Sequence, residues 1–169
     1  MSANLKDRLQ PALLDRLTDD DPLHREEAED ARVMSKARLR QAVLRDLGWL
    51  LNAVQPLGKQ ADSFPVLAGS VLNFGLPALS GQLASKVDVS VLEKAIRQTL
   101  IRYEPRILAD TLEVHAIEAT SVLDTHNVIE FEIRGHLWSQ PVPLEILLRT
   151  QLDLEAGQLE VRDQRLGGT

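Results

Sequence analysis

Two segments of the chain carry apolar residues at the three- and four-residue spacing of an amphipathic helix. In residues 35–54 the stripe consists of Leu39, Val43, Leu47, Leu50 and Val54. In residues 90–104 it consists of Leu92, Ile96, Leu100 and Tyr103. Ser90 and Glu93 have the spacing of a capping box, which satisfies two N–H groups at a helix start. Pro105 ends the second helix, because proline disfavours helical geometry at the residue before it.

From residue 112 onward the apolar period changes to two, which indicates strands with one buried face. Four runs alternate in this way, at residues 112–116, 129–134, 144–154 and 159–163. Two helices precede these strands and must cover their apolar face. The sequence therefore predicts an α+β fold: two main helices packed on one face of a four-stranded antiparallel sheet, with an N-terminal arm.

Residues 1–30 are predicted to form the arm and an acidic linker, and residues 31–169 a single domain. Within the arm, one short helical face can form from three leucines, Leu13, Leu14 and Leu17. The arm either docks through these leucines or is a disordered tail, and composition favours neither. Residues 19–30 hold seven acids and one base, so a solvated linker is expected there.

The chain has 169 residues, no cysteine and a net charge of −6. Phosphate repels such an average field, so a general nucleic-acid binder is excluded. The start of the chain is charged, and no apolar run approaches the ~20 residues of a membrane span. A cytoplasmic protein without direct membrane insertion is expected.

Residues 31–62 have a net charge of +4. Three of their arginines are predicted to form a solvated face, or to meet acids of a partner or of the linker: Arg38, Arg40 and Arg45.

Most catalytic patterns are missing from the sequence, which has no phosphate-binding glycine loop and no G-x-S-x-G elbow. A pairing of two strands can bring His115 and His136 next to each other, but a solvated histidine pair is far commoner than a metal site. Glu104, Glu130 and Glu132 offer carboxylate pairs of the kind that cleave glycosides. Fourteen acids after residue 62 make such pairs easy to draw by chance. No catalytic residue, metal or cofactor is therefore predicted.

The sharpest local feature is the run Glu104, Pro105 and Arg106, called the E-P-R motif below. Proline between opposite charges makes a rigid corner at a helix end, and the planar fork of arginine gives directional hydrogen bonds. An ordinary ion pair at a helix terminus is the alternative explanation.

Upstream, residues 55–88 are rich in proline and glycine, and their apolar run 66–77 is expected to pack onto the domain.

Four segments, in this order along the chain, resemble the TssE family, the type VI secretion subunits among the contractile-phage baseplate wedge proteins. The segments are Leu13–Leu17, the helix from Leu39 to Asn52, the run Ser70–Pro77 with Ser80-Gly81, and the E-P-R motif with Ile107. The resemblance spans about residues 10–165. Ala78 stands where these proteins commonly carry an aspartate, so a polar contact made there in relatives is not carried over to this chain.

The resemblance implies a non-enzymatic structural subunit of the type VI secretion baseplate. It implies that the E-P-R motif contacts the bundle of TssF/TssG-like wedge proteins, and that the domain templates a TssB/TssC-like sheath. A TssK-like baseplate subunit is a further partner, and Asn73, Gly75 and Pro77 form the family's motif loop. The protein would then be cytoplasmic and assembled at the inner face of the inner membrane. The family label "lysozyme-related" leaves a peptidoglycan hydrolase as one alternative, and an unrelated cytoplasmic adaptor is another.

An open sheet edge is what contact with a sheath strand requires, and a four-stranded sheet has two such edges. The last predicted strand is short and terminal. Its residues Leu159 and Val161 are therefore the candidate edge for sheath contact.

Overall fold

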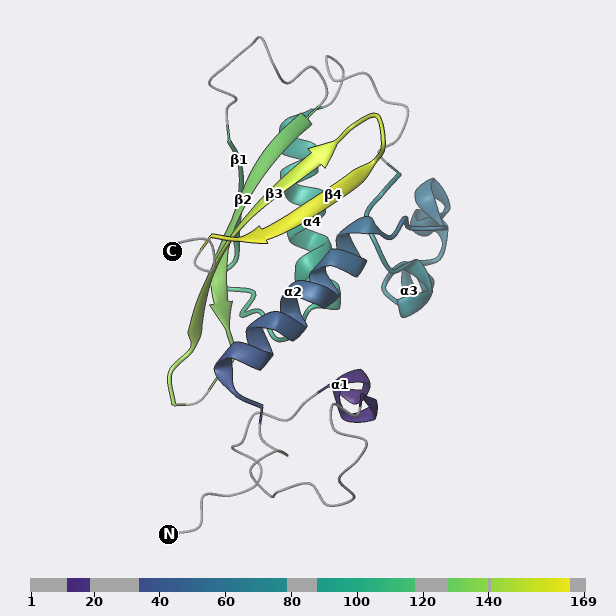
Figure 1. Cartoon of the computed structure of the whole chain (residues 1–169). Coiled ribbons are helices and arrows are strands. Elements are labelled where there is room, and N and C mark those ends of the chain that lie inside the picture. The colour runs from purple at the N-terminus through teal and green to yellow at the C-terminus, as the bar shows by residue number, and fades with distance from the viewer. Residues whose placement is uncertain (1–11, 19–33, 79–87, 118–127, 140, 165–169) are drawn as a thin grey trace.

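The computed structural model describes residues 12–18, 34–78, 88–117, 128–139 and 141–164. The predicted acidic linker and the first part of the arm lie outside these residues. Figure 1 shows two long helices, α2 (Lys36–Asn52) and α4 (Val89–Tyr103), against one sheet, and a short helix, α1 (Leu13–Leu17), beside α2.

The sheet has four antiparallel strands in the order β1-β2-β3-β4, so each strand pairs with its neighbour in sequence. The strands are β1 (Glu113–Ile117), β2 (Val128–Leu137), β3 (Leu144–Asp153) and β4 (Gln158–Asp163). The predicted four-stranded antiparallel sheet is confirmed. Strand β2 runs three residues beyond the predicted run, because Leu137 continues the alternation of buried residues past Gly135.

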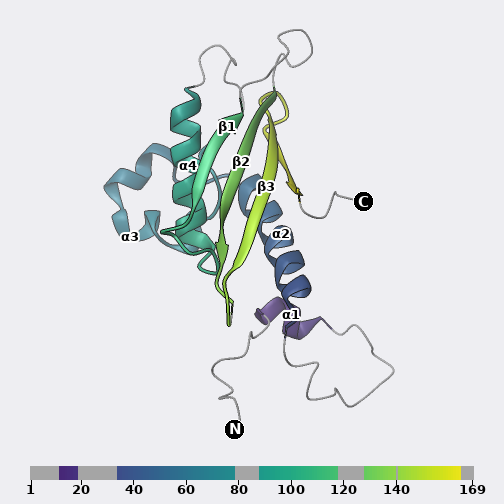
Figure 2. The ribbon, with the colours of Figure 1, turned by 90° about the vertical axis from the view of Figure 1, so that its left-hand side faces the viewer.

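Both long helices cover the same face of the sheet, as the view in Figure 2 shows, which confirms the predicted α+β class. The stripes predicted for the helices are buried, apart from Val54 beyond the end of α2 and the half-buried Tyr103. They meet alternate residues of the strands, including Phe131, Ile133, Ile146 and Leu148, which have almost no exposed surface. Full burial of each such side chain stabilises the fold by about 1.5–3 kcal/mol.

The N-terminus of α4 differs from the capping box expected at Ser90 and Glu93. Asp88 is the N-cap, and its carboxylate accepts a 2.9 Å hydrogen bond from the Ser90 backbone N–H. The helix therefore begins at Val89, two residues earlier than a cap at Ser90 would place its start. Glu93 instead accepts a 2.6 Å hydrogen bond from the backbone N–H of Ala116 on β1. The donor lies on the edge strand β1, and no local sequence pattern indicates this contact.

Between the long helices the chain forms three short helical turns, η3 (Gly58–Ser63), α3 (Pro65–Ala68) and η4 (Val71–Asn73). The chain then returns to the end of α2, where Leu76 and Val54 form an isolated parallel bridge. Gly75 lies at this return with φ at 117°, and a Cβ placed on it would lie 2.2 Å from the Ala53 carbonyl oxygen. Only glycine fits this close approach.

We predict that Gly75→Ala lowers the free energy of unfolding by about 3 kcal/mol or more, because it adds both backbone strain and a steric clash. Denaturant titration followed by circular dichroism measures the change. Gly58→Ala is the matched control, since Gly58 also has a positive φ, 47°, but has open space where its Cβ would lie. That change should cost about 1 kcal/mol. Equal losses for the two variants would contradict the role given to the contact with Ala53.

Candidate functional site

The E-P-R motif forms a charged corner directly after α4. Glu104 is the C-cap of the helix and is buried, Pro105 is exposed, and Arg106 is partly buried. The Arg106 side chain donates from Nε to Glu104 Oε1 at 2.6 Å and from a terminal nitrogen to Glu104 Oε2. The Arg106 backbone N–H also donates to Glu104. A buried carboxylate thus holds the guanidinium in one orientation by a two-point contact.

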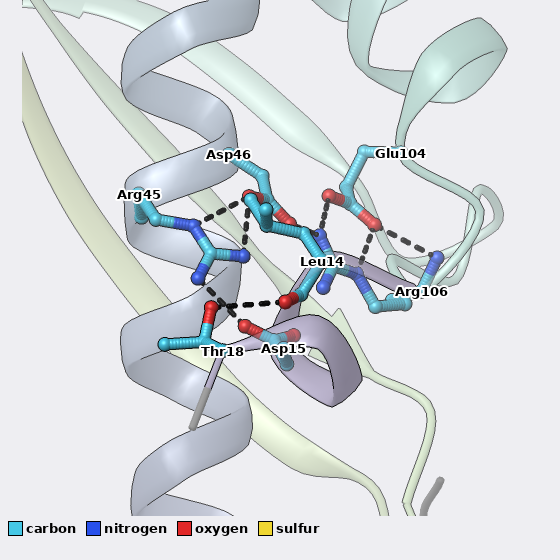
Figure 3. Close-up of polar contacts among 7 residues, drawn as sticks. All are labelled: Leu14, Asp15, Thr18, Arg45, Asp46, Glu104 and Arg106. Atoms are coloured by element: carbon cyan, nitrogen blue, oxygen red, sulfur yellow. Dashed lines mark hydrogen bonds and ion pairs between the residues drawn. The ribbon is translucent and has the colours of Figure 1, made fainter. Parts of the chain in front are cut away.

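Asp46 on α2 is a second acceptor for the same guanidinium, at 2.6 Å from Arg106 (Figure 3). Burial by itself lowers the pKa of Arg106, but Glu104 and then Asp46 outweigh it, so the pKa is raised well above its ordinary value. Arg106 therefore stays charged at every pH at which the protein is folded. The ion pairs tie the corner after α4 to the middle of α2.

Arg45 extends this network to the N-terminal arm. Its guanidinium donates to Asp46 and, at 2.6 Å, to Asp15 of α1 (Figure 3). The hydrogen bond to Asp15, and then the one to Asp46, raise the pKa of Arg45. Arg45 also lies over the Trp49 ring, 5.2 Å from its centroid, in a cation–π contact.

Within the described part of the arm, α1 contacts α2 through this ion pair, and none of its leucines is buried. No residue of α1 is buried, and Leu13 and Leu17 are 71% and 74% exposed. A helix of five residues can turn only one side toward α2. The ion pair between Asp15 and Arg45 determines which side this is. Residues 1–11 and 19–33 lie outside the described residues, and with them most of the predicted arm and linker.

A pocket of about 440 Å³ opens beside the charged corner and is called the corner pocket. Its wall contains the E-P-R motif, Asp46, and three aromatic residues, Trp49, Phe74 and Tyr103. Phe74 and Tyr103 pack edge to face, with ring centroids 5.5 Å apart, whereas Trp49 is about half exposed. An exposed tryptophan next to a fixed arginine is the composition found at the centre of many protein–protein interfaces.

The predicted motif loop contacts residues that line the corner pocket. Asn73 is buried, accepts a hydrogen bond from the Leu57 N–H and donates one to the Ala68 carbonyl. Its own carbonyl accepts a 2.7 Å hydrogen bond from the Tyr103 hydroxyl. Gly75 passes close to the end of α2, and Pro77 is exposed. Asn73 and Gly75 therefore position the wall of the pocket.

The candidate edge residues lie on the far side of α2 from the corner. Leu159 is buried, and both its N–H and its carbonyl are hydrogen-bonded to the Asn52 side chain, each at 2.8 Å. Val161 is half-buried against the core. Arg40 forms a 2.9 Å ion pair with Asp163, so two of the three singled-out arginines bind acids of the domain itself.

Several contacts at the corner and at β4 were not predicted from the sequence. Asp46 and Trp49 lie on the polar side of the α2 stripe, and Asn52 is near its end. The only local signal was an exposed tryptophan position on an amphipathic helix. Asp46 and Asn52 bind Arg106 and Leu159, which lie 60 and 107 residues away in sequence, and no spacing rule covers such distances.

The other candidate chemical groups are not brought together. His115 lies opposite Glu132, while His136 lies opposite Glu145, so the two histidines are not neighbours. The register of β1 against β2 sets this separation. Glu104 is paired with Arg106 on the helix side, whereas Glu130 and Glu132 alternate with core residues of β2 and face away from the helices. Within the described residues there is no metal-binding group of three His, Asp or Glu side chains.

The described elements form a small α+β domain whose charged corner lies beside a half-exposed tryptophan. A family model described as baseplate wedge protein gp25 matches residues 37–142, which is more than half of the chain. The chain therefore belongs to the baseplate wedge protein gp25 family, and this membership supports a structural role in a baseplate. The match includes the E-P-R motif and the motif loop but ends before β3 and β4. No match was found among curated proteins or among solved structures. None of the described helices has the length and apolar character needed to cross a membrane.

We predict that Glu104→Gln lowers the free energy of unfolding by about 3 kcal/mol, because it leaves the guanidinium of Arg106 partly buried without its main carboxylate. Urea titration at constant salt measures the change. Glu160→Gln is the matched control, since Glu160 makes the same two-point contact with Arg162, also two residues later, but on an exposed surface. Loss of that pair should leave stability essentially unchanged. An equal loss in both variants would contradict the importance of burial at the corner.

Proposed function

We propose that this protein is a non-enzymatic structural subunit of a type VI secretion baseplate, and that it joins the wedge through the corner pocket. The observation that carries the proposal is the fixed E-P-R corner beside Trp49, within a chain that belongs to the baseplate wedge protein gp25 family. The sequence resemblance to the TssE family supports the type VI system as the setting. The expected partners are TssF/TssG-like wedge proteins, with a TssK-like subunit in the same assembly.

The corner offers a partner a surface that is ordered before binding. Glu104 and Asp46 hold Arg106 in place, so little side-chain freedom is lost when a partner approaches. Pro105 and Trp49 are exposed next to the guanidinium and supply apolar contact area. A helix bundle with an apolar residue for the pocket and a carboxylate for the open side of Arg106 fits this surface.

The second part of the proposal is that a TssB/TssC-like sheath is templated at the open edge of the sheet. Helix α2 separates the two surfaces, since Arg45, Asp46 and Trp49 face the corner, while Arg40 and Asn52 contact β4. One domain can therefore hold the wedge and the sheath at the same time. Such an assembly belongs on the cytoplasmic side of the inner membrane, where a contractile sheath is built.

The corner is tested by copurification of the chain with the TssF/TssG-like proteins of the same genome. Arg106→Glu should abolish the complex, because it places a third acid beside Glu104 and Asp46. Trp49→Ala should weaken binding by 2 kcal/mol or more, roughly thirtyfold, with little change in stability, because the ring is half exposed. Isothermal titration calorimetry and thermal unfolding measure the two quantities separately.

Phe64→Ala is the matched control for the tryptophan variant. Phe64 is 53% exposed, compared with 55% for Trp49, and it does not line the corner pocket. Its loss should leave wedge binding unchanged. Normal binding by Arg106→Glu, or equal effects of the two aromatic variants, would exclude the corner pocket as the wedge contact.

A further inference from the structure

Helix α1 has the reverse of the usual amphipathic arrangement. Successive residues of a helix are turned by about 100° from one another. This angle places Asp15 on the side opposite to the three leucines of the helix, Leu13, Leu14 and Leu17. Within residues 12–18, Asp15 alone is not exposed, whereas all three leucines are exposed. The polar side of α1 therefore faces α2, and its apolar side faces outward.

The contact between α1 and α2 is small. Asp15 Oδ1 accepts the 2.6 Å hydrogen bond from Arg45, but Asp15 Oδ2 is buried and has no hydrogen-bond partner in the described part of the chain. A buried acceptor without a donor reduces stability. The helix has only five residues, and its N-cap, Ala12, makes no side-chain hydrogen bond to the first turn. Because so short a helix is not stable on its own, α1 needs a further contact to stay folded.

The exposed side of α1 continues the surface of the corner pocket. Ala12, the N-cap of α1, belongs to the wall of this pocket, together with Trp49 and Pro105. Arg45 connects the two parts, because it lies over the Trp49 ring and binds Asp15. Trp49 and Pro105 are both exposed. An exposed apolar area therefore extends from Pro105 past Trp49 to the leucines of α1.

A helix with an apolar stripe fits this area. Leu13 and Leu17 are one helical turn apart, and side chains at this spacing form the ridges by which one helix packs on another. The wedge partner proposed for the corner is a helix bundle with an apolar residue for the pocket and a carboxylate for Arg106. The same bundle can cover the leucines, because the pocket wall and α1 adjoin at Ala12.

We propose that α1 is a second contact for the wedge partner: its leucine side packs on an apolar helix of that partner, and Asp15 keeps α1 beside the corner pocket. The inference rests on the proposed function, because the partner is the TssF/TssG-like complex. It deepens that function by adding an element that becomes firmly placed only when the partner binds.

The direct test is residue-resolved amide hydrogen exchange of the full chain, with and without the TssF/TssG-like complex of the same genome. The Arg16 and Thr18 N–H groups donate to the Ala12 and Leu14 carbonyls, each at 3.0 Å. In the free chain they should exchange nearly as fast as in an unfolded peptide, and binding should slow both by about tenfold or more. The Ala116 N–H, which Glu93 holds on β1, should change little.

The leucine side is tested by the double variant Leu13→Ser/Leu17→Ser. It should weaken wedge binding by about tenfold or more, because it removes the apolar side chains that the partner covers. Its Tm should change by less than about 2 °C, because both leucines are exposed. The matched control is Val66→Ser/Val71→Ser, which changes two equally exposed aliphatic residues outside the pocket wall. This control should bind normally.

Asp15→Asn tests whether α1 assists the partner or only covers the corner. The substitution keeps the size of the side chain and removes the charge that holds Arg45. We expect wedge binding to weaken roughly three- to tenfold, because α1 is then no longer placed beside the pocket. Tighter binding by this variant would identify α1 as a cover that the partner displaces, and would overturn the proposal.

The outcomes separate the inference from the function on which it rests. If the wild-type chain binds the TssF/TssG-like complex but α1 is not protected, or the leucine variant binds normally, the role given to α1 is wrong and the corner contact stands. If the wild-type chain does not bind the complex, the proposed function itself fails. Concentration-dependent protection of α1 without the complex would identify a second copy as the occupant and overturn the proposal.

Discussion

The single apolar face of the four-stranded sheet is the constraint on which the other features of this domain depend. In the part of the chain that the structure describes, α2 and α4 cover that face, and each helix packs near one edge of the sheet. Polar side chains on the helices then come within reach of outward-facing backbone groups, as Glu93 does on β1 and Asn52 on β4. The helices therefore build the core and also determine which parts of the edges another chain can reach.

A second consequence concerns the other side of α2. Because α2 ends up between β4 and the corner after α4, its polar residues face two different environments. Asp46 and Arg45 join the corner to α1, so a segment far away in sequence is fixed by ion pairs and not by apolar burial. Glu104 needs a charged partner because it is buried, and the partner it holds, Arg106, is thereby preorganised. Stability of the corner and its readiness to bind have the same physical cause.

The charged groups of the corner are held in ion pairs with one another. The carboxylates that could have formed an acid pair are separated by the sheet, and Glu104 is neutralised by Arg106. The exposed groups at the corner are a proline, a tryptophan and one side of a guanidinium. Membership in the baseplate wedge protein gp25 family agrees with a structural role. The corner and the β4 edge lie on opposite sides of α2.

The sequence by itself determined the fold class, because periods of 3.6 and 2 report directly which face of each element is buried. It also located the E-P-R motif, since the proline marks the helix end between the opposite charges. Tertiary structure alone decided the partners of these charges. Asp46 and Asn52 meet Arg106 and Leu159 across 60 and 107 residues of chain. Asp88 caps α4 in place of Ser90, and Glu93 accepts a hydrogen bond from β1. Hydrogen bonds act over about 3 Å, so they depend on register and packing that no local pattern records.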